Sequence, residues 1–213
     1  MTWSLAERTV FITGAARGIG AELARQVAAR GARVALAGLE PERLAALAIE
    51  LGADHAWFEC DVTNQFALEA AVAGTVRRFG GIDVVVANAG IASNGTVAVA
   101  PADALARVID VNLTGVIRTV SATLPHVTSR GGYVLLISSA AAFAALPGLS
   151  AYAASKAGVE QFGNALRLEV AHDGVDVGTA HPSWIDTDMV RDAKDDFASF
   201  NETLGALPGR SAA

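Results

Sequence analysis

Tyr152 and Lys156 are the residues whose types and spacing most directly suggest chemistry in this sequence of 213 residues. Side chains four positions apart lie on one face of a helix. A tyrosine hydroxyl titrates near pH ~10, too high for a base at neutral pH, but a neighbouring ammonium favours the phenolate. The pair could therefore exchange a proton with the oxygen of a carbonyl or an alcohol. By itself this spacing is a weak indication, because it is common on helices.

A glycine-rich segment near the N-terminus is the second candidate. Residues 13–20 read TGAARGIG, follow an apolar run and lead directly into a helical segment, Ala21–Arg30. Glycines at a strand-to-helix turn let the backbone approach a pyrophosphate, whose charge the helix N-terminus stabilises. Any tight turn favours glycine, so the position in the first β-α unit is what makes the segment informative. It predicts a site for a dinucleotide.

The elements that must position these residues alternate along the chain. Between the expected strands, apolar residues recur at helical spacing, for example at Leu68, Val72, Val76 and Phe79. The strands are short and almost wholly apolar, as expected where helices cover both faces of a sheet. Strict alternation predicts a single-domain α/β fold, a doubly wound Rossmann-type parallel sheet with helices on both faces. The expected strands are Thr9–Thr13, Arg33–Ala37, His55–Cys60, Asp83–Ala87, Tyr133–Ser138 and Val175–Ala180.

Two further short motifs follow in order. Asp61-Val62 comes after the third strand, and Asn88-Ala89-Gly90 ends the fourth. With TGxxxGIG and YxxxK in register, the chain resembles the short-chain dehydrogenase/reductase superfamily over about residues 7–189. Ala87 stands where that family's NNAG motif has its first asparagine, and Ser183 replaces the glycine of its PG motif. The resemblance implies an NAD(P)-dependent oxidoreductase that interconverts a secondary alcohol and a ketone by hydride transfer.

The resemblance also assigns roles to four residues. Tyr152 would be the general acid/base, and Lys156 would assist it and bind the nicotinamide ribose. Ser139 would orient the reacting oxygen; Ser138 is the alternative, but the spacing to Tyr152 favours Ser139. Asn112 would hold a water linked to the lysine. The implied cofactor contacts are Gly14, Ala16, Arg17, Gly18, Ile19, Gly20, Gly38, Leu39, Glu40, Asp61, Val62, Asn88, Ala89, Gly90, Tyr152, Lys156, Pro182, Ile185 and Thr187.

The choice between NAD and NADP depends on residues after the second strand. An acidic residue at the end of that strand would bind the ribose 2′-hydroxyl and select NAD, but Gly38 and Leu39 stand there. Glu40 could reach the ribose, whereas Arg17, with Arg43 nearby, could bind a 2′-phosphate. Because Glu40 would repel that phosphate, the sequence favours NAD and leaves NADP open.

The C-terminal segment differs in character from the rest. Residues 1–189 are expected to form the dinucleotide-binding and catalytic unit. In 190–213 an apolar stripe that includes Phe197, Phe200 and Leu204 predicts an amphipathic helix, interpreted as a substrate lid. Family members typically continue with another helix and a seventh strand. We therefore expect a truncated tail and an open edge at the sixth strand.

Composition narrows the remaining possibilities. The formal net charge of −6, without a basic tract, argues against nucleic acid as a partner. The single cysteine, Cys60, favours a reducing compartment, and with no signal peptide or membrane span evident we expect a cytoplasmic protein. No metal-ligand spacing is evident. The resemblance implies a homodimer or homotetramer acting on a small carbonyl or alcohol. The segments expected to shape the pocket, Ile91–Val99, Phe143–Leu149 and the lid, are apolar, which favours an apolar substrate. The alternatives are a catalytically impaired cofactor-binding or regulatory protein and an epimerase or dehydratase.

Overall fold

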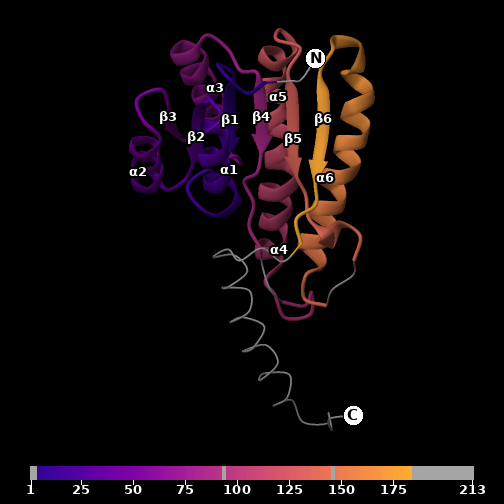
Figure 1. Cartoon of the computed structure of the whole chain (residues 1–213). Helices are drawn as coiled ribbons and strands as arrows, with labels where there is room; N and C mark the ends of the chain where they lie inside the picture. Colours follow the sequence, from indigo (N-terminus) through magenta and orange to yellow (C-terminus); the bar gives the residue numbers. More distant parts are fainter. Residues whose placement is uncertain (1–3, 93–94, 145–146, 184–213) are drawn as a thin grey trace, which may run out of the picture.

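Six short parallel strands form one sheet in the order β3-β2-β1-β4-β5-β6 (Figure 1). The computed structural model describes residues 4–92, 95–144 and 147–183. Each strand ends at the same edge of the sheet, and the strand order reverses between β1 and β4, which is where parallel α/β sheets bind ligands. The strands are β1 (Thr9–Thr13), β2 (Arg33–Gly38), β3 (Ala56–Glu59), β4 (Val84–Ala87), β5 (Tyr133–Ile137) and β6 (Asp176–Ala180).

Helices connect the strands and cover the sheet unequally. On one face, α3, α5 and α6 pack against strands from β2 to β6, whereas α1 and α2 on the other face pack mainly against β1, β2 and β3. The helices are α1 (Gly18–Ala28), α2 (Pro41–Leu51), α3 (Gln65–Phe79), α4 (Ala102–Ile109), the π-helix η1 (Asp110–Thr114), α5 (Gly115–Thr128), the 3-10 helix η2 (Ala140–Ala142), α6 (Ser150–Glu169) and the 3-10 helix η3 (Ala171–Asp173).

The core follows from this unequal coverage. Phe11, Val85 and Leu136 are fully buried in a large apolar cluster under α3, α5 and α6. On the α1 face, Ile12 and Leu36 are fully buried. Toward β5 the same face is less covered.

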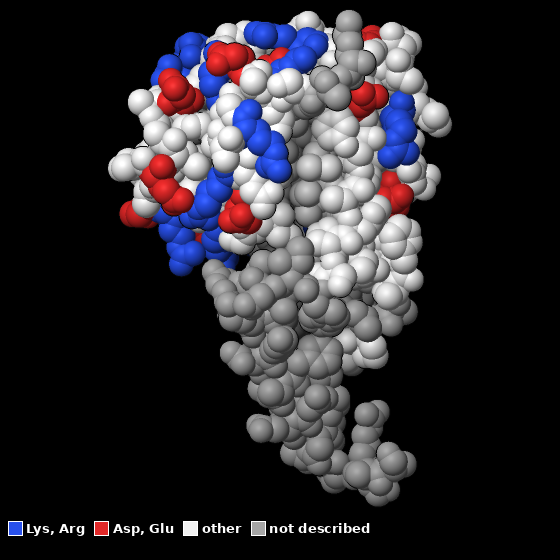
Figure 2. Space-filling model, viewed as in Figure 1, with Lys and Arg blue, Asp and Glu red and all other residues white. Residues whose placement is uncertain are grey.

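Part of the α1 face lies open among the described residues. Tyr133 and Leu135 point to this side of β5 and are half-buried, whereas Val134 and Leu136, which alternate with them, are fully buried. They line an apolar hollow with Val84 and Val86. Figure 2 shows the surface over β4 and β5 with little charge. Parallel sheets usually bury both faces, so this hollow is an apolar surface without a helix over it in the described part of the chain.

The fold agrees with the expectation from the sequence. All six predicted strands occur, with ends that differ by at most one residue; β3, for example, is shorter than the predicted His55–Cys60 by one residue at each end. The helical spacing at Leu68, Val72 and Phe79 belongs to α3, which buries all three. Residues 184–213, including the predicted lid and truncated tail, lie outside the described residues.

Candidate active site

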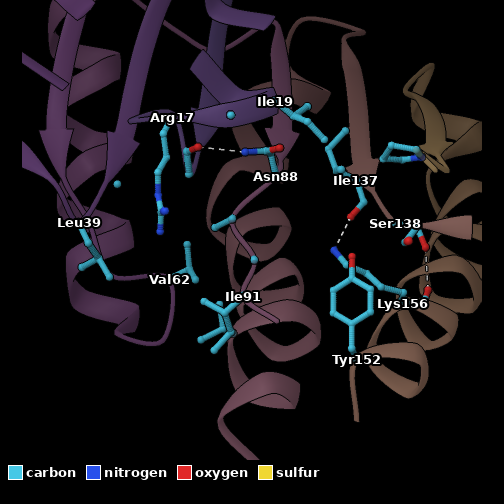
Figure 3. A pocket seen from close by; sticks show the side chains of 18 of the residues that line it. Arg17, Ile19, Leu39, Val62, Asn88, Ile91, Ile137, Ser138, Tyr152 and Lys156 are labelled. Carbon is cyan, nitrogen blue, oxygen red and sulfur yellow. Dashed lines mark hydrogen bonds between the residues drawn. The ribbon is translucent and has the colours of Figure 1, made fainter. Parts of the chain in front are cut away.

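A cleft opens at the carboxyl ends of the strands, on both sides of the point where the strand order reverses (Figure 3). Sixteen of the residues predicted from the sequence line it, from the glycine-rich turn at one end to the loop after β6 at the other. They are Gly14, Arg17, Gly18, Ile19, Gly38, Leu39, Glu40, Asp61, Val62, Asn88, Ala89, Gly90, Ser139, Tyr152, Lys156 and Pro182.

The start of α1 forms one wall of the cleft. Arg17 is the N-cap residue, and no side chain caps the first turn, which also contains no acidic residue. The backbone N–H groups of a first helical turn lack partners within the helix. Because Gly18 and Ile19 line the cleft, these donors and the positive end of the helix are suited to an anion such as a diphosphate.

The glycines of this turn are required by close packing. Gly14 has a φ of +64°, in the left-handed region that glycine adopts easily. Gly20 does not line the cleft; a Cβ there would lie 2.3 Å from the Gly14 oxygen and 2.6 Å from Nδ2 of Asn88. Ala16 also lies outside the lining and is buried. Gly20 and Ala16, both predicted to contact the cofactor, therefore pack behind the turn.

Asn88 fastens the turn to the end of β4. Its Nδ2 donates to the backbone oxygens of Thr13 (2.9 Å) and Gly14 (3.1 Å). In the opposite direction, the Thr13 hydroxyl accepts from the backbone N–H groups of Asn88 (3.1 Å) and Ala89 (3.2 Å). The NAG motif thus ties β1 to β4 where the cleft begins.

The far end of the cleft, beyond β2, carries opposite charges. Nε of Arg17 lies 3.1 Å from Oε1 of Glu40, and both side chains remain partly exposed. The two residues that the sequence left as competing determinants of cofactor choice are therefore paired with each other. Next to them, Oδ1 of Asp61 accepts from the N–H and hydroxyl of Thr63, both at 2.8 Å.

Tyr152 and Lys156, the predicted proton-transfer pair, lie on α6. Lys156 is almost wholly buried, and its Nζ donates to the Ile137 oxygen at 2.9 Å. The same Nζ lies 5.7 Å from the centre of the Tyr152 ring, which is half-buried at the cleft (Figure 3). Burial lowers the pKa of Lys156 to about 8. Burial also raises the pKa of Tyr152, partly offset by the Ser139 hydroxyl. The sequence predicted a lowered Tyr152 pKa. In the protein alone, the pKa is instead raised, because the effect of burial is larger.

The two serines after β5 have different surroundings. Ser138 is buried, and its hydroxyl donates to the backbone oxygen of Lys156 at 2.8 Å, so it ties β5 to α6. Ser139 is half-buried, and its hydroxyl accepts from the N–H of Ala141 at 3.2 Å. Both line the cleft. The Ser138 hydroxyl proton is used on the backbone of α6, whereas the Ser139 hydroxyl interacts with the Tyr152 phenol.

Asn112 lies behind the cleft, in the π-helix η1 between α4 and α5. Its amide is fully buried: Oδ1 accepts from the N–H of Ile91, and Nδ2 donates to the Ile91 oxygen, each at 2.8 Å. Nδ2 also donates to the Ser155 hydroxyl at 3.2 Å. The amide thus joins the segment after β4 to α6. Its predicted link to Lys156 through a water stays a prediction.

The loop after β6 closes the other end. Pro182 lines the cleft, and its oxygen accepts from the N–H of Ala140 at 3.0 Å. Ile185 and Thr187, also predicted to contact the cofactor, lie outside the described residues.

Several lining residues were not among those predicted. Arg107 and Val111 come from the α4–η1 segment, and Cys60 lies at the end of β3. Cys60 is buried, which raises its pKa to about 11 and keeps the thiol protonated. Most of these residues are apolar and resemble core residues in the sequence, so only Arg107 offered a chemical signal. The remaining three are Ile91, Ile137 and Ser183.

Comparison with known proteins decides the family. The sequence profile of the short chain dehydrogenase family matches residues 8–198. The chain belongs to this family. Over 202 residues it is 36% identical to trans-4-hydroxycyclohexanecarboxylate dehydrogenase of Sinomonas cyclohexanicum, covering 91% of this chain and 78% of that one. The resemblance inferred from TGxxxGIG, NAG and YxxxK is thereby confirmed, and the chain is an oxidoreductase of the short chain dehydrogenase family.

Solved structures in the family have the same fold. An actinorhodin polyketide ketoreductase solved with NADPH is 33% identical, with a TM-score of 0.87, over 91% of this chain and 76% of that one. A 3-ketoacyl-(acyl-carrier-protein) reductase from Brucella melitensis, solved with NADH, is 27% identical, with a TM-score of 0.86, over 88% and 80%. These short chain dehydrogenases include structures with each of the two nicotinamide cofactors.

Proposed function

We propose that this short chain dehydrogenase binds NAD(P) in the cleft and interconverts a secondary alcohol and a ketone, with Tyr152 as general acid/base. The observation that carries the proposal is the arrangement within one cleft. Tyr152 and Lys156 line the same cleft as the uncapped first turn of α1. A proton-transfer pair and a phosphate site on one surface fit a reaction on a substrate held beside a dinucleotide.

The residues of the cleft fit that cofactor. The first turn of α1 would hold the diphosphate. Gly90 lets the chain pack closely on the amide behind the cleft, since a Cβ there would lie 3.3 Å from Oδ1 of Asn112. Lys156 would bind the nicotinamide ribose. When bound, the nicotinamide ring supplies or accepts the hydride and, when oxidised, adds a positive charge beside the phenol.

Tyr152 would move the proton. In ketone reduction its hydroxyl donates to the carbonyl oxygen, and in alcohol oxidation the phenolate takes that proton back. The Ser139 hydroxyl would donate to the same oxygen and stabilise the charge that develops on it. Burial disfavours the phenolate, so the buried cationic form of Lys156 is the protein's own counter-charge. The rate of alcohol oxidation should therefore increase as the pH rises, and the rate of ketone reduction should increase as the pH falls.

For the cofactor we propose NAD. Glu40 lines the cleft beyond β2, where the adenosine ribose would lie, and a carboxylate can accept from both ribose hydroxyls. Arg17 is already paired with Glu40, and a 2′-phosphate would have to compete with that carboxylate.

For the substrate we propose an apolar carbonyl compound or its alcohol. Ile91, Val111 and Ile137 are apolar residues that line the cleft, and a relative is named for a ring alcohol, trans-4-hydroxycyclohexanecarboxylate. We also propose that the protein is a cytoplasmic homodimer or homotetramer. No described helix is long and apolar enough to cross a membrane.

The test uses the two tyrosines of the chain as a matched pair. The protein is mixed with a panel of ketones and NADH or NADPH, and the absorbance of the reduced nicotinamide is followed. We expect turnover with at least one ketone, and a loss in kcat of about 10²- to 10⁴-fold for Tyr152→Phe with dinucleotide binding kept. Tyr133→Phe, whose hydroxyl lies over Gly178 on the sheet, should retain activity. A fully active Tyr152→Phe variant would refute the mechanism.

A further inference from the structure

Glu160 and His181 form a side-chain pair beside the cleft that the proposed mechanism does not use. Nε2 of His181 lies 2.6 Å from Oε2 of Glu160, and both side chains are about three-quarters buried. Because a carboxylate only accepts, the imidazole N–H donates. A hydrogen bond of this length to an ionised acceptor is at the strong end of the range, and its burial shields it from water and salt.

The pair joins α6 to the loop after β6. Glu160 lies one turn beyond Lys156 on α6, so it is on the helix that also presents Tyr152. His181 directly precedes Pro182, which lines the cleft. The bond therefore links the helix that would hold the proton donor to the loop at the nicotinamide end of the cleft.

The same histidine also touches the loop after β5. The rings of His181 and Phe143 lie 5.0 Å apart, tilted by 51°. Phe143 is largely exposed and follows Ser139 by four positions. A second contact, from the N–H of Ala140 to the Pro182 oxygen at 3.0 Å, joins the same two loops. Three separate segments, which carry Tyr152, Ser139 and Pro182, thus meet at His181.

We propose that Glu160 and His181 are positioning residues for the reaction. Their hydrogen bond fixes the loops after β5 and β6 relative to α6, and so sets the separation between the Ser139 and Tyr152 hydroxyls and the cofactor end of the cleft. The inference rests on the proposed function. Neither residue is needed to touch the substrate. Misplacement of reacting groups by about 1 Å can lower a rate by ~10²-fold, so a modest loosening of these loops is enough to matter.

A contact farther along the same helix provides the control. Nε of Arg167 donates to the Val177 oxygen at 3.0 Å, and this bond also ties α6 to β6. Its position is near the opposite end of the strand from the cleft. Removing it should loosen the packing of α6 on β6 without moving the loops around His181, which separates a general loss of stability from a loss of positioning.

The experiment compares four variants in the intact chain. His181→Phe keeps an aromatic ring beside Phe143 but removes the bond to the carboxylate; Glu160→Ala removes the acceptor; Glu160→Gln retains one; Arg167→Leu is the control. We expect kcat to fall about 10- to 100-fold in the first two, with the dinucleotide Kd within about twofold. The primary deuterium isotope effect should rise as hydride transfer becomes limiting. Glu160→Gln should recover most of kcat, and Arg167→Leu should lower Tm but leave kcat and the isotope effect unchanged.

The outcomes are distinguishable. If His181→Phe and Glu160→Ala lower Tm but keep kcat and the isotope effect of the wild type well below Tm, the pair is merely structural and the inference is wrong. If Arg167→Leu lowers kcat as much as His181→Phe and Glu160→Ala do, then Glu160 and His181 are not specific positioning residues. A wild-type protein without turnover on any ketone would instead overturn the proposed function, and this inference with it.

Discussion

At the scale of single residues, the cleft contains a buried cation. All but a few per cent of the Lys156 surface is buried, and its ammonium donates a hydrogen bond to the Ile137 oxygen. Burying an ammonium costs free energy unless it is well compensated. The lowered pKa of about 8 expresses that cost. The protein thus keeps at this position a group that weakens its own folded state, as expected of a residue retained for chemistry.

This cost predicts how stability depends on pH. Below the folded pKa of about 8 the ammonium is charged in both states, and its burial costs the folded state the whole ~3 kcal/mol that separates that pKa from 10.5. Between the two pKa values the unfolded chain binds more protons, so stability rises with pH. Relative to Lys156→Met, the wild type should gain about 2 kcal/mol in unfolding free energy from pH ~7 to pH ~9.5, measured by urea denaturation. A constant difference between the two proteins would contradict this account.

The Arg17–Glu40 pair makes a second residue-scale prediction. Glu40→Gln removes the carboxylate that would compete with a 2′-phosphate for Arg17. The ratio of the Kd for NADP to that for NAD should fall at least ~10-fold, equivalent to ~1.4 kcal/mol, in a fluorescence titration. Glu42→Gln, an exposed residue in the first turn of α2, is the control and should leave the ratio unchanged. If Glu40→Gln leaves the ratio as it is, Glu40 does not select the cofactor.

At this scale, the residues that could be predicted from the sequence are those whose types and spacing indicate a reaction or a binding site. Tyr152, Lys156 and the glycine-rich turn were found because a motif joins residues close together in the chain. Ile137 and Val111 were missed, because apolar residues that line a cleft look like core residues in the sequence. The Glu160–His181 pair was missed for a different reason: its members are 21 positions apart on two elements, and only the packing of α6 against β6 brings them together.

At the scale of elements, the β1–α1 unit depends on close backbone packing. A Cβ on Gly20 would approach the Gly14 oxygen to 2.3 Å, and a backbone atom cannot swing away as a side chain can. The segment around Asn112 shows the opposite situation. Its amide reaches Ile91 from a π-helical turn between α4 and α5. Apolar periodicity did not predict that turn, because one extra residue per turn over five positions leaves almost no trace in a sequence pattern.

Substitution at Gly20 tests the packing of this unit. Although alanine favours helix formation, we expect Gly20→Ala to destabilise the protein by about 1–3 kcal/mol through overpacking and to weaken dinucleotide binding as the turn shifts. Chemical denaturation and a binding titration measure the two effects. Gly158→Ala is the matched control, because the atoms nearest to its added methyl group belong to the flexible side chain of Leu113. Equal effects in the two variants would show that the close approach to Gly14 is unimportant.

At the scale of the whole molecule, the sequence predicted the six strands, their parallel direction and the doubly wound fold, but not the order in which the strands pair. Alternating apolar strands and helices leave few topologies, and right-handed crossovers select among them. The uneven coverage of the sheet could not be predicted. Tyr133 and Leu135 are as apolar in pattern as Val134 and Leu136, yet only the latter pair is fully buried. Burial of the second face of the sheet depends on which helices pack over it, and the composition of the strands does not indicate where those helices lie.

The bond from Arg167 to β6 has a consequence for association between molecules. β6 is the last strand of the described sheet. Asp176 and Ala180 hydrogen-bond toward β5, so the backbone of Val177 between them faces the free edge. An exposed edge can template the addition of a strand from another chain. The Arg167 side chain occupies the Val177 oxygen and places a positive charge at that edge. An incoming strand would first have to displace the guanidinium, so we expect this arginine to disfavour strand addition at the β6 edge.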